Sequence, residues 1–391
     1  MQITTKFKKP LSQAEKICLW LFPLSCVVGW ISPNSKYYII PNMEIYLSFI
    51  TIFFSFIFGN RLWERKNKKV VGFLLISSAF FFLIETIIHL ERPFITTIYF
   101  VLFAVSFLIL NHKYRQCCCE RFINIMSIIF LLGMIEYALA YVGVNFFWGT
   151  YERASNPFYQ GVFMSINAYY QSIPARFMSI CEEPGSVGTI ALFGIATIDR
   201  VKYKKQYYIF LFAGLLSLSL AFYLLGALYY VFYFRSKDVS LGRIVLAIIA
   251  IVSLIFLFGE FINYRITERI TSADNIQSLD NRNSDEVDKR FAQYIGTSDA
   301  LWGLGHRTYY NWKKKTDNIS VGFKEKVFMY GFFGVFLMFI IYSIVYLKFH
   351  GFNKKSYKIL LIYWISFYQR SYWFEPSITM MMFSPPRKEE V

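Results

Sequence analysis

Residues 61–89, RLWERKNKKVVGFLLISSAFFFLIETIIH, decide the class of the fold. Five Lys and Arg residues fall within the first nine positions, and twenty mainly apolar residues follow them. An apolar helix of about 20 residues is long enough to cross the hydrocarbon core of a bilayer. Similar apolar blocks, separated by short basic clusters, recur along the chain, and this alternation is typical of a polytopic membrane protein.

The composition of the 391-residue chain agrees with this interpretation. Hydrophobic residues make up 56% of the chain, aromatic residues 20% and charged residues only 17%, and the mean hydropathy is +0.40. A soluble globular protein carries about 25% charged residues. The composition therefore excludes a water-soluble fold.

The net charge and the metal-ligating residues exclude further classes of function. A net charge of +16 would suggest a nucleic-acid partner in a soluble protein. The long polar stretch 263–326, however, holds eleven Lys and Arg against nine Asp and Glu, so it lacks the basic excess of a nucleic-acid surface. The six Cys and four His residues show no zinc spacing. We expect no nucleic-acid partner, no metal and no cofactor.

Twelve membrane-spanning helices can be placed along the sequence, which predicts an all-α polytopic integral membrane protein with a single transmembrane domain over residues 1–391. The expected spans are 16–31, 43–59, 70–89, 94–111, 122–144, 185–198, 206–218, 219–234, 243–262, 327–347, 359–368 and 373–383. The last two spans flank a polar turn at Gln369 and Arg370.

The distribution of Lys and Arg predicts the orientation. If the N-terminus is cytoplasmic, 25 Lys and Arg residues lie inside, and five lie outside when the long stretch 263–326 is set aside. Short cytoplasmic loops are enriched in basic residues, so both termini are expected in the cytoplasm. Two longer segments then face the exterior, a first outer segment at 145–183 and a large outer loop at 263–326. Function is expected on this outer face.

Charged residues at the outer boundary are the first candidates for chemistry. Pro184 and Gly185 set a turn where the chain enters a span, so Arg176, Glu182 and Glu183 are expected to converge there. An interfacial Arg and an acidic residue at the positive end of a helix dipole would give the same pattern without a catalytic role.

The large outer loop carries a second set of candidates. Arg290 and Arg307 are able to hold a phosphate or pyrophosphate, since the guanidinium group binds phosphate through two parallel hydrogen bonds. Asp317 or His306 is able to accept a proton from a hydroxyl group. A solvated charged loop is the alternative interpretation of the same residues.

Glu85 and Glu136 lie inside expected spans, where an ionisable group costs several kcal/mol unless it is paired or hydrated. Each is consistent with a proton or cation path, or with a neutral carboxylic acid that forms hydrogen bonds between helices.

Several short motifs follow one another in a characteristic order. They are Arg176 before Glu183-Pro184-Gly185, Ser217 and Ser219 at the turn of a split apolar pair, Arg290 and Gly303-Leu304-Gly305 in one large outer loop, and Asp317-Asn318 before the glycine-rich stretch 329–334. In this order they resemble the O-antigen polymerase and ligase superfamily of bacterial membranes, and the resemblance covers the whole architecture.

The resemblance implies a metal-independent inverting glycosyltransferase with a GT-C-like fold in the bacterial inner (cytoplasmic) membrane. Its substrates would be glycans carried by undecaprenyl pyrophosphate, and its outer loop at 263–326 would be periplasmic. The implied catalytic residues are Asp317, His306 and Glu183, and the implied pyrophosphate-binding residues are Arg176, Arg290 and Arg307. Membrane lipids and a chain-length regulator protein are the further partners expected. We expect Arg176 and Arg290 to meet over one outer pocket.

Three functions remain open at this point. Ligases of the superfamily usually carry His-Asn where this chain has Asp317-Asn318, and this departure favours a polymerase that joins O-antigen repeat units. The alternatives are a ligase that transfers the polysaccharide to the lipid A core, and a lipid-linked oligosaccharide flippase or transporter. A flippase is expected to place cationic side chains inside a central cavity.

Overall fold

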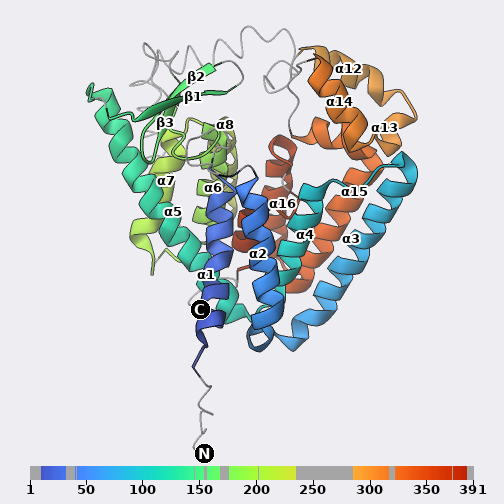
Figure 1. Cartoon of the computed structure of the whole chain (residues 1–391), viewed down its shortest axis with the longest axis horizontal. Coiled ribbons are helices and arrows are strands. Elements are labelled where there is room, and N and C mark those ends of the chain that lie inside the picture. Colours follow the sequence, from blue (N-terminus) through green and yellow to red (C-terminus); the bar gives the residue numbers. More distant parts are fainter. Residues whose placement is uncertain are drawn as a thin grey trace, which may run out of the picture.

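The computed structural model describes residues 10–31, 40, 42–144, 146–153, 156–167, 176–200, 202–234, 285–316, 322–371 and 373–384. Within these ranges the chain is mostly helical, with one small sheet (Figure 1). The helices of the bundle are α1 (Gln13–Val28), α2 (Met43–Phe58), α3 (Lys68–His89), α4 (Ile95–Leu108), α5 (His112–Tyr141), α6 (Pro184–Thr197), α7 (Lys204–Leu216), α8 (Leu220–Phe234), α15 (Phe323–His350), α16 (Lys354–Gln369) and α17 (Pro376–Met382). Two 3-10 turns, η1 (Asn60–Leu62) and η2 (Arg65–Asn67), join α2 to α3.

Three of the described helices are long and apolar enough to cross a membrane. They are Arg65–His89, which includes η2 and α3, His112–Tyr141 and Phe323–His350. Eleven of the twelve expected spans coincide with helices, and the ninth, 243–262, lies outside the described residues. Helix α17 has seven residues and is therefore about 10 Å long, against about 30 Å for the hydrocarbon core, so it does not cross a bilayer by itself.

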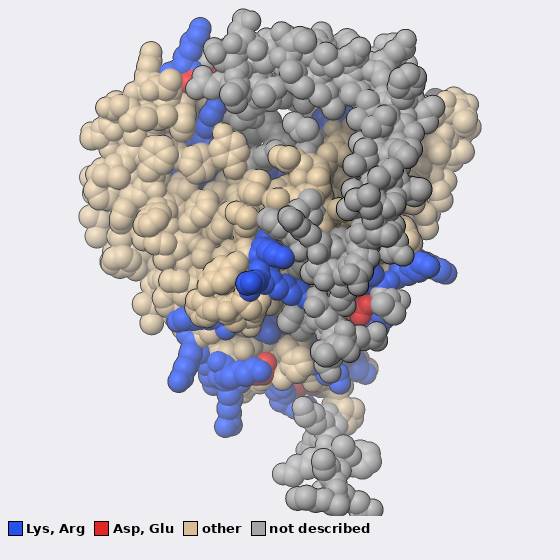
Figure 2. Space-filling model, turned by 180° about the vertical axis from the view of Figure 1, so that it is seen from behind, with Lys and Arg blue, Asp and Glu red and all other residues tan. Residues whose placement is uncertain are grey.

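The two ends of the bundle differ in charge. Figure 1 shows the connections α2–α3, α4–α5, α6–α7 and α15–α16 at the lower end, which we call the basic end because it carries the Lys and Arg clusters at 61–69, 113–121, 200–205 and 348–358. Figure 2 shows Lys and Arg side chains gathered at this end. The opposite end, which we call the sheet end, holds the small sheet, the α7–α8 turn and the helices α12 (Asp285–Ile295), α13 (Asp299–Trp302) and α14 (His306–Thr316).

The sheet in the first outer segment is a departure from the all-α expectation. Strands β1 (Gly149–Arg153), β2 (Asn156–Gln160) and β3 (Ser165–Asn167) pair antiparallel in the order β1-β2-β3. Tyr151 lies opposite Phe158, and their rings stack at 5.3 Å. Cross-strand aromatic pairs of this kind stabilise sheets. The strands were not predicted because they are short, so the alternation of apolar and polar residues along them is weak beside the apolar spans.

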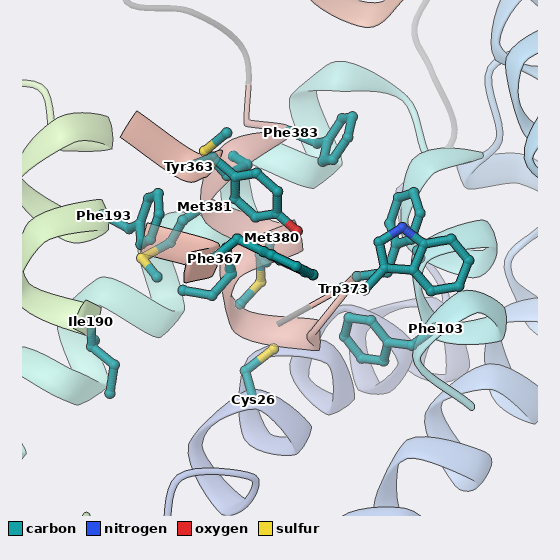
Figure 3. Close-up of a cluster of buried hydrophobic side chains, with 14 of the residues drawn as sticks. Cys26, Phe103, Ile190, Phe193, Tyr363, Phe367, Trp373, Met380, Met381 and Phe383 are labelled. Atoms are coloured by element: carbon teal, nitrogen blue, oxygen red, sulfur yellow. The ribbon is translucent and has the colours of Figure 1, made fainter. Parts of the chain in front are cut away.

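The buried core is centred on α17, which packs against α1, α4, α5 and α6. Figure 3 shows Met380 and Met381 of this helix among Cys26 of α1, Phe103 of α4 and Phe193 of α6. All five side chains are at most 2% exposed. Large apolar side chains on α2 and α3 instead point outward, among them Phe53 and Ile76 at 60% and 74% exposed. Such apolar surfaces are stable against the hydrocarbon of a bilayer but unfavourable in water.

A break in α15 attaches the helices α12–α14, which we call the outer unit, to the bundle. Gly331 has φ 64° and ψ 176°, so the helix is interrupted there. The freed carbonyl oxygens of Phe328 and Met329 accept hydrogen bonds from the backbone N–H groups of Leu304 and Gly305, at 2.7 and 3.1 Å. The Gly303-Leu304-Gly305 motif and the glycine-rich stretch 329–334 therefore contact each other.

Candidate functional site

Helix α6 begins at the Glu-Pro-Gly motif for local reasons. Glu183 is extended, with φ −152° and ψ 157°, and Pro184 occupies the first helical position, where its missing N–H is not needed. The Glu183 side chain does not cap the helix. It forms an ion pair with Arg370 instead.

Arg370 comes from the turn between α16 and α17, 187 residues away in the sequence from its partner. Its Nη2 donates to Glu183 Oε1, and its Nη1 donates to Ser186 Oγ at 3.0 Å. The side chain of Arg370 is 7% exposed, whereas that of Glu183 is 39% exposed. A guanidinium group is thus buried beneath a carboxylate that reaches the surface.

The turn that carries Arg370 is fixed on both sides. Phe374 adopts the left-handed conformation, with φ 52°. Glu375 caps α17 by accepting hydrogen bonds from the backbone N–H groups of Ser377 and Ile378, at 3.1 and 2.8 Å. Ser371 Oγ donates to Gly322 O at 3.0 Å, which ties the turn to the start of α15. The position of Arg370 is therefore determined by the packing of three helices.

Arg176 lies on the segment before α6 and contacts the α7–α8 turn. Its Nε donates to Ser217 O at 3.0 Å and so satisfies a carbonyl at the end of α7. The α7–α8 turn packs closely on the first turns of α6, because a Cβ added to Gly188 would lie 2.8 Å from Ser219 Cβ. We call Glu183, Ser186 and Arg370 the α6 site, and Arg176 contacts the α7–α8 turn that packs on the same helix.

A second cluster of polar residues lines a pocket where α3 is joined to α4, which we call the corner pocket. Its lining residues are Phe82, Glu85, His89, Glu91, Arg92, Pro93, Phe94, His306 and Tyr330. Glu91 Oε2 lies 3.2 Å from His306 Nδ1 and accepts from the backbone N–H of Arg307 at 2.9 Å. Glu91 Oε1 accepts from the backbone N–H of Thr308 at 3.2 Å. Glu91 therefore caps the N-terminus of α14 from a different part of the chain.

His306 is partly buried beside the carboxylate of Glu91. Burial lowers the pKa of His306 below its ordinary value of 6.5; Glu91 opposes this shift, and His89 and Arg307 add to it. A neutral His with Nδ1 at a carboxylate resembles the arrangement of a general base. In the part of the chain that the structure describes, no three His, Cys, Asp or Glu side chains gather into a group that could hold a metal ion.

The two carboxylates inside expected spans both have partners. Glu85 Oε2 lies 3.2 Å from Nε2 of His89, one turn further along α3. Glu136 accepts hydrogen bonds from the backbone N–H groups of Val162 and Phe163, at 3.1 and 2.8 Å. Glu136 therefore fixes the loop between β2 and β3, a role that the two sequence interpretations did not include.

The remaining candidates of the large outer loop lie elsewhere. The guanidinium carbon of Arg290 sits 4.1 Å from the centroid of the Trp312 ring, which joins α12 to α14. The Arg307 side chain is exposed at the start of α14. Asp317 lies outside the described residues.

The structure thus groups the candidates into separate places. Glu183 belongs to the α6 site, Arg176 contacts the α7–α8 turn, His306 lines the corner pocket, and Arg290 and Arg307 belong to the outer unit. Figure 1 shows α12 and α14 across the sheet end from α6, α7 and α8. The expected meeting of the Arg176 and Arg290 guanidinium groups is not seen in this arrangement.

Arg370 and Glu91, the charged residues that hold these clusters together, were not among the sequence candidates. The sequence offered a sign of a buried charge at Arg370, because this residue is a cation between two apolar segments. The sequence offered no such sign at Glu91, since a single acidic residue after a span is common.

Comparisons with known proteins give no match: no protein-family model, no curated protein and no solved structure matches this chain. Its function therefore has to be inferred from its own residues.

Proposed function

We propose that the protein is a glycosyltransferase that polymerises O-antigen repeat units carried by undecaprenyl pyrophosphate. In the reaction, a hydroxyl group of one glycan attacks the anomeric carbon of another, inverts it and expels the lipid pyrophosphate. Such a leaving group needs positive charge placed where its negative charge develops.

The observation that supports this proposal is the α6 site. Arg370 donates to Ser186 in the first turn of α6. Arg176 donates to Ser217 O of the α7–α8 turn, which packs against α6 at Gly188, so the two guanidinium groups are held by segments that contact the same helix. The positive end of a helix and guanidinium groups both bind phosphates in proteins without a metal. Glu183 in the same site is the proposed base.

The proposal includes a topology. A GT-C-like arrangement of the spans would place the basic end and both termini in the cytoplasm of a bacterium, and the sheet end in the periplasm. The segments 145–183 and 263–326 would then bind the glycans, with Arg290, Arg307 and Asp317 on the large periplasmic loop. A chain-length regulator and membrane lipids are the proposed partners.

Deleting the gene and examining surface lipopolysaccharide by gel electrophoresis tests the reaction. Loss of a polymerase leaves core capped with a single repeat unit. Bare core would favour the ligase or flippase alternatives, and an unchanged ladder of chain lengths would overturn the proposal.

Complementing the deletion with variants tests the site. Arg176→Ala should abolish long chains although the protein still inserts, because a cation of the leaving-group site is lost. Arg176→Lys should also be impaired, since the ammonium group lacks the guanidinium fork. Arg65→Ala is the matched control, because Arg65 is exposed at the basic end, and it should restore the full ladder. A full ladder from Arg176→Ala would place the site elsewhere.

A further inference from the structure

We propose that Arg370 exchanges partners during the reaction: it holds Glu183 while the site is empty, and it binds the donor diphosphate when the donor enters, which releases Glu183 to accept the proton of the attacking hydroxyl. This inference rests on the proposed function and assigns a role to the C-terminal hairpin of α16 and α17.

The first argument is the fixed position of the cation. The backbone N–H of Arg370 donates to Ser366 O at 2.8 Å in the last turn of α16. Trp373 Nε1 donates to Met338 O at 3.0 Å, so the residues after Arg370 are tied to α15. Nη1 is held by Ser186 in addition to the contact of Nη2 with Glu183. When one partner leaves, the guanidinium group therefore stays in place.

The second argument is the unequal exposure of the two partners. Arg370 is nearly buried, and a buried cation without an anion is strongly unfavourable. The empty site therefore needs an anion at this position, and Glu183 supplies it. Glu183 is 39% exposed, so its carboxylate is able to move toward solvent without breaking the core.

The third argument is that a diphosphate competes well for this position. It carries more negative charge than a carboxylate and matches the planar fork of the guanidinium group. The N-terminus of α6, which the Glu183 side chain does not cap, adds a favourable dipole for the same anion.

The step balances without a further reactant. The acceptor hydroxyl oxygen forms a bond to the anomeric carbon, and the bond from that carbon to the diphosphate oxygen breaks, with its electron pair staying on the diphosphate. The hydroxyl proton passes to the carboxylate of Glu183. Arg370 neutralises the departing charge and returns to Glu183 after the lipid diphosphate has left.

The exchange predicts an unusual pair of effects for Glu183→Gln. The variant removes the competitor of the diphosphate, so it should bind undecaprenyl pyrophosphate about three- to tenfold more tightly, which is about 0.7–1.4 kcal/mol. It also removes the base, so glycan polymerisation should fall about 100-fold or more. An ion pair with a merely structural role predicts no gain in binding.

The measurement uses the full chain in lipid nanodiscs and the equilibrium binding of radiolabelled undecaprenyl pyrophosphate. Polymerisation of lipid-linked repeat units is followed in the same preparation. Glu120→Gln makes the same chemical change on α5 at the basic end, where Glu120 pairs with Lys202, and should leave binding and polymerisation unchanged. Arg370→Lys keeps the charge without the fork and should weaken binding about tenfold.

The outcomes separate the two proposals. Unchanged or weaker binding in folded Glu183→Gln, beside active wild type, overturns the exchange alone. Absence of polymerisation by the wild type overturns the proposed function, whatever the binding. If Glu183→Gln does not fold, Arg370→Lys decides, because undiminished lipid diphosphate binding in that variant overturns the exchange.

Discussion

Gly303 and Gly331 lie against each other's chain segments where no side chain fits. A Cβ added to Gly331 would lie 2.2 Å from Leu301 O, and a Cβ added to Gly303 would lie 2.5 Å from Met329 O. Both residues also have positive φ, 64° and 93°, which other L-residues rarely adopt. Glycine at these two positions is what allows the outer unit to approach the break in α15.

Gly331→Ala should therefore destabilise the protein. The backbone conformation at φ 64° and ψ 176°, which is essentially restricted to glycine, costs about 1–3 kcal/mol for a residue with a Cβ, and the contact with Leu301 O adds to this. Thermal unfolding of the purified protein in detergent should show a lower midpoint. Gly72→Ala on α3 is the matched control, since nothing lies within 4 Å of its added Cβ, and its midpoint should not fall. Equal midpoints for the two variants would contradict the packing described here.

At the scale of elements, the outer unit is held on the bundle by polar contacts at one corner. Glu91, from the connection between α3 and α4, caps α14 through the backbone N–H groups of Arg307 and Thr308. Helix α13 is attached to α15 through the hydrogen bonds at the α15 break. A capping carboxylate stabilises a helix by about 0.5–2 kcal/mol, so Glu91 is a main support of α14.

The docking of α14 should weaken in acid. The pKa of docked His306 is lowered by burial from 6.5, so the undocked residue binds a proton more readily. The stability of docking is then complete above about pH 6.5 and is lost progressively as the pH falls below it. Amide hydrogen exchange of α14, corrected for intrinsic rates, should show up to about tenfold more opening at pH 5.5 than at pH 7.5, because pH 5.5 lies about one unit below the ordinary pKa of 6.5.

Two variants test whether His306 causes the pH dependence of α14 docking. His306→Gln removes the titrating group, so the difference in exchange between the two pH values should disappear. Glu91→Gln keeps only a neutral acceptor at the cap, so exchange of α14 should rise at both pH values. A pH dependence that persists in His306→Gln would assign the effect to another group.

For the whole molecule, the difference in charge between the two ends predicts the orientation in the membrane. The basic end carries the short Lys and Arg clusters, and the sheet end carries the outer unit and the small sheet. By the positive-inside rule we predict that the basic end lies in the cytoplasm.

Cysteine labelling of intact spheroplasts with a membrane-impermeant maleimide tests this orientation. Ser298→Cys, between α12 and α13, should react directly, whereas Lys354→Cys, at the start of α16, should react only after permeabilisation. Both positions are exposed. Cys117→Ser is a suitable background, since the other five native Cys residues are buried. The opposite pattern would invert the topology and place the α6 site toward the cytoplasm.

The apolar blocks of the sequence located the helices well. Eleven expected spans coincide with helices to within a few residues, apart from α5, which begins ten residues earlier. Hydropathy succeeds here because a membrane-spanning helix is a local property of about 20 consecutive residues. The sheet of 149–167 was missed, because its stability comes from pairing between strands.

The candidate site could be predicted only in part. The sequence by itself determined that Arg176 and Glu183 stand at the entrance of a span, since Pro184 and Gly185 define that turn locally. Only the tertiary structure decided that Glu183 pairs with Arg370, that Glu91 caps α14 across 216 positions, and that Arg290 stacks on Trp312. The physical reason is that these contacts depend on how each helix is rotated and packed against its neighbours, and helix rotation is set by the whole bundle rather than by any one segment.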